Sequence, residues 1–138
     1  AQVLESGLAI VAKRRKSATE VESLAIIGEV RGKNVLMVDD LTETAGTLTH
    51  ASDLLHRRGA KQILACVSHA LLNDMGIERL RKSKIDELIT TDTVLRPAIE
   101  GIRITTLSVA GLLGEAIHRI HKNLSVTSLF EIAGARTS

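Results

Sequence analysis

Two adjacent carboxylates, Asp39 and Asp40, stand between an apolar run and a loop of small and hydroxyl residues. The apolar run at 35–38 predicts a short buried strand, so both acids are expected at its carboxyl end. In an open α/β sheet, ligands bind at that edge. Two carboxylates there can accept hydrogen bonds from ribose hydroxyls or hold a hydrated Mg²⁺.

The loop that follows contains Thr44, Ala45, Gly46 and Thr47, and it opens a predicted helix. Free backbone N–H groups at a helix start stabilise an anion, Gly46 allows close approach of the backbone, and the threonines add hydroxyl donors. We therefore expect one loop to bind both ends of a ribose phosphate. The alternative is ordinary helix capping, which uses the same residue types.

A run of four cations, Lys13, Arg14, Arg15 and Lys16, lies in a predicted loop. Such a run can close over a polyphosphate and neutralise its charge. The alternative is a solvated surface run without a ligand.

The elements that must position these residues alternate between strand and helix, which predicts an α/β fold with a mainly parallel sheet of about five strands flanked by helices. Apolar or small residues recur at helical spacing from Leu48 to Leu55, and Gly59 stops that helix. The expected strands lie at 21–30, 35–38, 63–67, 86–91 and 102–107, with a further candidate strand at 8–11. The expected helices lie at 47–58, 75–83 and 109–121.

The composition is that of one globular domain, expected to span residues 1–138. The chain is 44% hydrophobic and 25% charged, and its net charge of +2 is too small to indicate a nucleic-acid partner. Phe130 is its one aromatic residue, so there is no platform for stacking bases. No apolar stretch reaches the roughly 18 residues of a membrane span, and we expect a cytoplasmic protein with no membrane partner.

The segment VDDLTETAGT, residues 38–47, resembles the phosphoribosyl diphosphate (PRPP) loop of the type I phosphoribosyltransferase fold. The cationic run at 13–15 and the ending Ser-Val-Thr-Ser-Leu-Phe at 125–130 further resemble the C-terminal half of ribose-phosphate diphosphokinase, the PRPP synthetase family. That family transfers diphosphate from MgATP to ribose 5-phosphate, giving PRPP and AMP, and its members form homo-oligomers, typically hexamers.

The resemblance implies a role for each matching position. Lys13 and Arg15 are expected to be catalytic by stabilising the transferring diphosphoryl group, and Ser125 and Thr127 to belong to a regulatory site. Mg²⁺ is the expected cofactor, with Asp39 and Asp40 as candidate ligands. The expected ribose 5-phosphate-binding residues are Asp39, Asp40, Glu43, Thr44, Ala45, Gly46 and Thr47. The polar segments 68–69 and 91–93 match strand-end motifs of the family.

One position departs from the family pattern: Glu43 stands where Asp is more common. The extra methylene keeps the charge and moves it by about one bond length, and a displacement near 1 Å can alter catalysis.

Two other functions share the same loop. The chain is alternatively a phosphoribosyltransferase that consumes PRPP, or a non-catalytic PRPP synthetase-associated regulatory subunit. The resemblance places most of the ATP site in another half of the enzyme. Because the chain begins with Ala1 and not Met, we expect a fragment. Because the resemblance places the ATP site elsewhere, we expect this fragment to be inactive alone.

Overall fold

The computed structural model describes residues 5–14, 23–95 and 98–130, and the side chains of 13, 14, 23 and 24 are outside that description. The described residues divide into two compact units. Residues 9–107, with their gaps, form the larger unit, and residues 5–8 and 108–130 form the smaller one.

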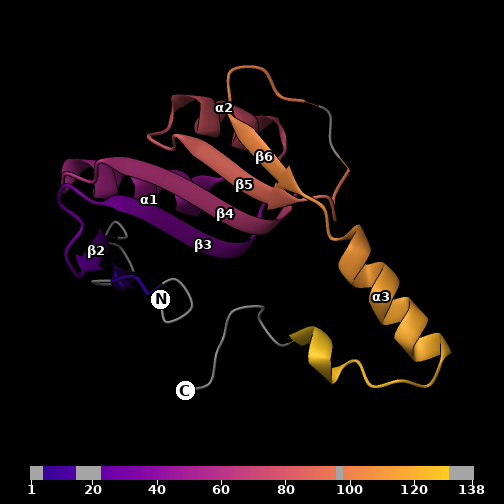
Figure 1. Cartoon of the computed structure of the whole chain (residues 1–138). Coiled ribbons are helices and arrows are strands. Elements are labelled where there is room, and N and C mark those ends of the chain that lie inside the picture. The colour runs from indigo at the N-terminus through magenta and orange to yellow at the C-terminus, as the bar shows by residue number, and fades with distance from the viewer. Residues whose placement is uncertain (1–4, 15–22, 96–97, 131–138) are drawn as a thin grey trace. The chain divides into compact units, whose positions relative to one another are not determined.

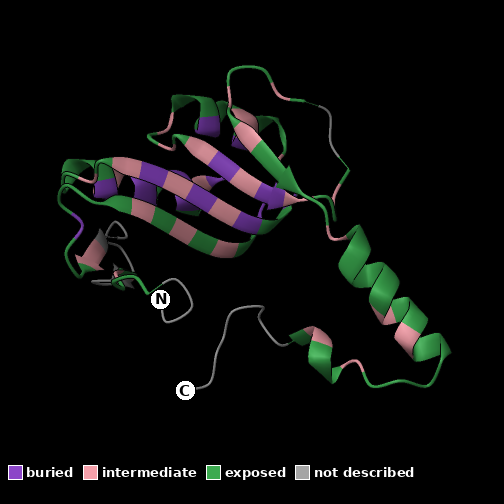
Figure 2. Ribbon diagram, in the orientation of Figure 1, coloured by how far each residue is buried: buried purple, intermediate pink, exposed green. Residues whose placement is uncertain are grey.

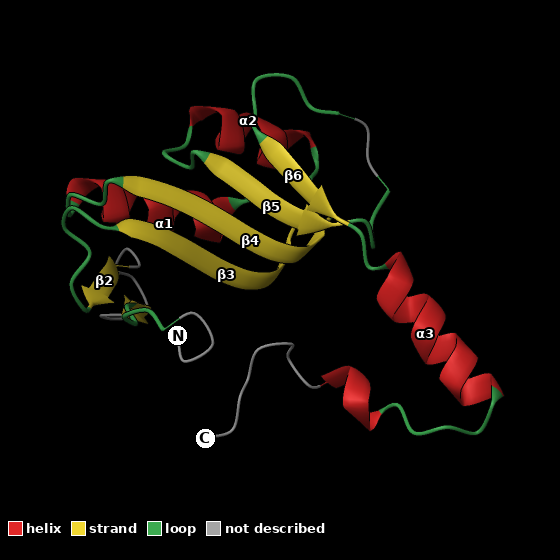
Figure 3. Cartoon of the chain, viewed as in Figure 1, coloured by secondary structure: helices red, strands yellow, loops and turns green. Residues whose placement is uncertain are grey.

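A four-stranded parallel sheet is the centre of the larger unit (Figure 1). Its strands are β3 (Asn34–Thr42), β4 (Gln62–Ala70), β5 (Glu87–Thr91) and β6 (Ile104–Leu107), in that spatial order. Helices α1 (Gly46–Arg57) and α2 (Asp74–Lys82) connect successive strands and lie together on one face of the sheet (Figure 3). The prediction of an α/β fold with a mainly parallel sheet and flanking helices is confirmed.

Strands β1 (Ile10–Arg14) and β2 (Ser23–Ile27) form a separate antiparallel hairpin. The described residues therefore contain six strands in two sheets, not about five in one. Lys13 was expected in a loop, but its backbone lies in β1 opposite Leu24. A hairpin pairs through backbone groups, so a charged side chain does not end the strand.

The core lies between the sheet and its two helices. Leu48 of α1, Leu80 of α2 and the strand residues Ala65, Val67 and Leu88 are each at most 4% exposed. Burial alternates along β4 and β5, so that every second side chain faces the helices (Figure 2). This packing fixes the carboxyl ends of the strands, from which the candidate site is built.

Two strands run further than their apolar sequences predict. Asp39 and Asp40 were expected after a strand ending at 38, but β3 continues to Thr42. Likewise β4 continues through Ser68 and His69 to Ala70. The two extensions pair with each other, Leu41 opposite His69, so backbone bonding prolongs both strands beyond their apolar cores.

The smaller unit contains α3 (Ala110–His121) and the 3₁₀ helix η1 (Thr127–Phe130). The predicted helix at 109–121 is thus confirmed. Searched over the described ranges, the structure holds no helix with the length and apolar character needed to cross a bilayer.

Candidate functional site

The loop from Glu43 to Thr47 makes a sharp left-handed turn into α1. Ala45 has φ 52° and ψ 13°, a conformation that costs a non-glycine residue about 1–2 kcal/mol. Its side chain is only 2% exposed and packs in the core with Leu48, which holds the turn in place. Such strained positions cluster at ligand-binding sites.

The start of α1 has unpaired backbone donors. Ala45 is the N-cap, and no side chain caps the helix there. The first intrahelical donor is Thr49, whose N–H bonds to the Ala45 carbonyl at 2.9 Å. The N–H groups of residues 46–48 are therefore free to bind an anion, as the sequence predicted.

A small cavity opens over this turn, with a volume of about 130 Å³. Drug-sized sites usually exceed about 300 Å³, so this one fits a small polar group such as a phosphate. Its lining comes from the end of β3, the loop and the first turn of α1: Asp39, Leu41, Thr42, Glu43, Thr44, Ala45, Gly46, Thr47 and Leu48. The structure thus brings six of the seven predicted ribose 5-phosphate residues together.

Asp40 is the predicted residue that does not line the cavity. Successive side chains of a strand point to opposite faces, so Asp40 points away from the side on which Asp39 lies. The Asp40 N–H also donates to Asp39 Oδ1 at 3.0 Å, which leaves Oδ2 of Asp39 for a ligand.

Helix α2 supports the loop from behind through three contacts that sequence reasoning missed. The Arg79 side chain donates from Nη1 to the Thr44 carbonyl at 3.1 Å, and the Asn73 N–H donates to the Glu43 carbonyl at 3.2 Å. Gly76 approaches the same Glu43 carbonyl so closely that no Cβ fits between them. No sequence signal joined these residues to a loop about 30 positions earlier.

Arg79 also adds positive charge beside the free N–H groups. A Cβ built on Gly46 would lie 3.3 Å from Arg79 Nη1, so the guanidinium is adjacent to the first residue of α1. The site is therefore electrostatically divided. Backbone donors and Arg79 attract an anion at the helix start, while Asp39 at the strand end favours hydroxyl donors or a cation.

Metal binding was predicted at Asp39 and Asp40. Over the described part of the chain, no group of three or more His, Cys, Asp or Glu side chains is placed to hold a metal ion. Mg²⁺ is commonly held by one or two carboxylates together with waters and substrate phosphates. The Asp39 carboxylate, next to a phosphate-sized cavity, fits that requirement.

A larger cavity, of about 330 Å³, lies elsewhere, between β6 and the segment after β5. Among the described residues that line it, Ile99, Ile102 and Ile104 are apolar and Asp92 is charged. The uncapped backbone N–H groups lie at the smaller cavity, which is therefore the candidate anion site.

The predicted catalytic residues cannot be placed with respect to this site. Arg15 lies outside the described residues, and for Lys13 only the backbone, in β1, is described. Both roles stay predictions.

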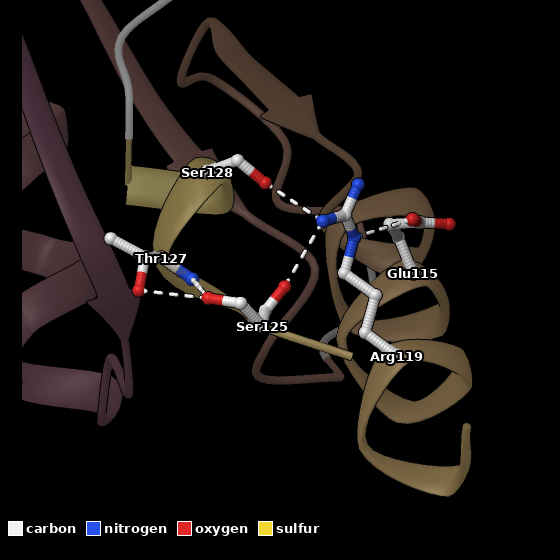
Figure 4. Close-up of polar contacts among 5 residues, drawn as sticks. All are labelled: Glu115, Arg119, Ser125, Thr127 and Ser128. Carbon is white, nitrogen blue, oxygen red and sulfur yellow. Dashed lines mark hydrogen bonds and ion pairs between the residues drawn. The ribbon is translucent and has the colours of Figure 1, made fainter. Parts of the chain in front are cut away.

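The predicted regulatory residues lie in the smaller unit, where Arg119 organises them (Figure 4). Arg119 on α3 pairs with Glu115 at 2.7 Å and donates to the Ser125 carbonyl at 3.0 Å and to Ser128 Oγ at 2.8 Å. Ser125 Oγ donates to Thr127 Oγ1 at 3.0 Å and accepts from the Thr127 N–H at 3.2 Å. The two predicted hydroxyls thus form a local cap for η1, next to a cation that sequence reasoning missed.

Comparison with known proteins matches most of the chain to one family. Residues 6–131 match the family model described as the phosphoribosyl synthetase-associated domain. Among curated proteins, ribose-phosphate pyrophosphokinase of Caldanaerobacter subterraneus is 47% identical over 131 residues, covering 94% of this chain and 42% of the relative. Ribose-phosphate pyrophosphokinase 1 of Spinacia oleracea is 43% identical over 130 residues, covering 92% of this chain and 38% of the relative.

A solved structure shares the fold. The crystal structure of phosphoribosylpyrophosphate synthetase from Mycobacterium smegmatis is similar with a TM-score of 0.66 and 32% identity, over 73% of this chain and 34% of that one. The chain thus spans about two fifths of the length of the curated relatives it matches.

Proposed function

Because the chain belongs to the phosphoribosyl synthetase-associated domain family, we propose that it is the ribose 5-phosphate-binding, C-terminal half of a PRPP synthetase. The whole enzyme would transfer diphosphate from MgATP to ribose 5-phosphate, giving PRPP and AMP, and assemble as a homo-oligomer. Residues 1–138 would serve as one domain of type I phosphoribosyltransferase fold in the cytoplasm. The observation that supports this most is the divided cavity at residues 39–48.

The binding mode follows from the charges of that cavity. The phosphate group lies against the N–H groups of residues 46–48, with the hydroxyls of Thr44 and Thr47 and the Arg79 guanidinium beside it. Each hydrogen bond to a charged group contributes about 1.5–3 kcal/mol, so a few such donors suffice to bind a phosphate. The ribose then lies toward Asp39, whose carboxylate accepts from its hydroxyls.

Mg²⁺, when bound, would neutralise charge on the diphosphate during transfer. Asp39 is the residue of this chain best placed to hold it, because its carboxylate borders the cavity. Lys13 and Arg15 keep their proposed role of stabilising the transferring group, Asp40 that of a second ribose or metal ligand, and Ser125 and Thr127 that of a regulatory site.

The test is calorimetric titration of the chain with ribose 5-phosphate in the presence of Mg²⁺, with ribose as the control ligand that lacks phosphate. We expect heat with ribose 5-phosphate and none with ribose. Asp39→Asn should weaken binding more than Asp40→Asn, because Asp39 lines the cavity and Asp40 does not. Absence of heat with ribose 5-phosphate would refute the proposal.

The isolated chain should make little or no PRPP, because we place the ATP-binding half outside it. PRPP formation by the chain alone, at the rate of a full-length relative, would contradict the assignment of the ATP site to another half of the enzyme.

A second candidate is a non-catalytic subunit that regulates an active synthetase, and the description of the matching family as an associated domain favours it. The two candidates differ in one measurement. Joined to an ATP-binding half from a relative, a catalytic domain should restore PRPP formation and a regulatory one should not. A PRPP-consuming transferase would instead turn over PRPP with an acceptor in the absence of ATP.

A further inference from the structure

A second group of polar side chains stands at the carboxyl ends of β4 and β5. His69 Nδ1 lies 2.8 Å from Thr93 Oγ1, and Thr93 Oγ1 lies 2.8 Å from Thr91 Oγ1. Both hydroxyls donate to the Ser68 carbonyl, Thr91 at 2.7 Å and Thr93 at 3.2 Å. The four residues form a closed hydrogen-bonded cluster that the proposed function does not use.

Counting hydrogens decides which nitrogen of the His69 ring is protonated. Each threonine hydroxyl supplies one hydrogen, and the Ser68 carbonyl supplies none. If Thr93 gave its hydrogen to His69, one hydrogen would remain for three oxygen–oxygen contacts. If His69 Nδ1 carries a hydrogen and donates it to Thr93, both hydroxyl hydrogens remain for those contacts. The second arrangement satisfies more of the cluster and is favoured.

A neutral ring with hydrogen on Nδ1 has a bare lone pair on Nε2. Within the described residues, no protein group hydrogen-bonds to Nε2, and the residue is exposed. His69 is therefore an oriented acceptor, with Thr93 fixing its tautomer.

His69 is also adjacent to the cavity. It pairs with Leu41, one of the cavity-lining residues, and adjacent strands lie about 4.8 Å apart. Two positions further on, the Leu71 N–H donates to the Thr42 carbonyl at 2.9 Å, which ties the end of β4 to the start of the loop. The backbone of His69 is thus within one strand spacing of Leu41, at the edge of the cavity.

We propose that His69 is a further ligand-binding residue, which accepts a hydrogen bond at Nε2 from a hydroxyl of the bound sugar phosphate. The tautomer inferred for His69 does not depend on the proposed function, whereas the ligand contact rests on it. Asp39 and His69 would then accept from the sugar from two neighbouring strands.

The tautomer is tested by ¹⁵N–¹H NMR of the histidine rings in the free chain, which distinguishes the two neutral forms and the imidazolium. We expect neutral His69 to carry its hydrogen on Nδ1. Thr93→Val should remove that preference, and the matched variant Thr93→Ser should retain it because it keeps the hydroxyl. A neutral ring with hydrogen on Nε2, or a tautomer unchanged by Thr93→Val, overturns the inference.

The ligand contact is tested by titration with ribose 5-phosphate while the His69 ring and the amides of residues 44–47 are followed together. We expect both to shift. Shifts of the loop amides without the ring would overturn the role of His69 and leave the proposed function standing. If neither the His69 ring nor the amides of residues 44–47 shift, the proposed function itself is refuted.

Two substitutions of His69 distinguish the roles of its two ring nitrogens. Asparagine places its amide near the position of Nδ1, and glutamine reaches that of Nε2. His69→Asn should therefore weaken ribose 5-phosphate binding by roughly 2- to 12-fold, the range for one hydrogen bond, and His69→Gln should weaken it less. Inorganic phosphate, which has no sugar hydroxyl, should bind both variants like the wild type. Equal loss with phosphate and with ribose 5-phosphate would refute the hydroxyl contact.

Discussion

Replacing Gly76 by alanine tests whether α2 positions the loop at residues 43–47, the proposed phosphate-binding loop. Gly76 is buried in the first turn of α2, where its N–H donates to Asn73 Oδ1 at 2.9 Å. A Cβ at this position would lie well within 3.0 Å of the Glu43 carbonyl oxygen and 3.3 Å from the Glu43 carbonyl carbon. Both are backbone atoms, so no side-chain rotation relieves the contact, and either the helix or the loop must move.

The size of the effect follows from three terms. Overpacking costs about 1–3 kcal/mol. Displacing the Glu43 carbonyl also endangers its hydrogen bond from the Asn73 N–H, which contributes about 1 kcal/mol. Alanine is better than glycine inside a helix by up to about 1 kcal/mol, which offsets that loss. We therefore expect a net destabilisation of about 1–3 kcal/mol, a fall in Tm of at least about 4 °C.

Gly76→Ala should weaken ribose 5-phosphate binding as well as lower stability. The loop that moves also carries the backbone N–H groups proposed to bind the phosphate. A displacement near 1 Å should weaken ribose 5-phosphate binding by at least about tenfold. The assays are thermal unfolding by circular dichroism and calorimetric titration of the folded variant below its Tm.

Gly114→Ala is the matched control. Gly114 lies inside α3, and a Cβ there has no atom within 4 Å, so the same change should leave stability unchanged or raise it. If Gly76→Ala unfolds at the wild-type temperature, the close approach is not a constraint. If it unfolds earlier but binds normally, α2 does not position the loop.

Three further predictions concern charged groups of the same region. Arg79→Gln should lower stability by about 0.5–1.5 kcal/mol through loss of its bond to the Thr44 carbonyl, and weaken phosphate binding more than Arg79→Lys does in calorimetry. Glu43→Asp should tighten ribose 5-phosphate binding by about twofold, because the shorter side chain loses less rotamer freedom on binding; weaker binding would contradict that reason. The hydrogen bond from Arg81 lowers the pKa of Glu78 below its ordinary 4.5. Its stabilising contribution is present above that value and is lost as pH falls through the lowered pKa, so Arg81→Met should return the pKa toward 4.5 in an NMR titration, and an unchanged value would refute the attribution.

Most helices and strands were predictable because their signals are local. The stripe from Leu48 to Leu55 predicted α1 within one residue of its observed ends, since an amphipathic face and a glycine stop are properties of consecutive residues. Strands β3 and β4 were predicted too short at their carboxyl ends. Apolar character ends at Val38 and Val67, whereas β3 and β4 continue as long as their backbones pair.

The amino-acid sequence by itself determined which chemical groups the candidate site contains. Its carboxylates, its hydroxyls and its turn into a helix are all contained in residues 39–47, and each depends on near neighbours in the chain. The resemblance to the PRPP loop, carried by the same segment, was visible for that reason.

Only the tertiary structure decided which distant residues meet at the candidate site. It separated Asp39 from Asp40, because β3 extends through both and directs them to opposite faces. It brought Arg79 to a carbonyl 35 residues earlier and Thr93 to a histidine 24 residues earlier. Parallel strands gather distant loops at one edge of the sheet, and no periodicity in the sequence encodes which side chains then meet there.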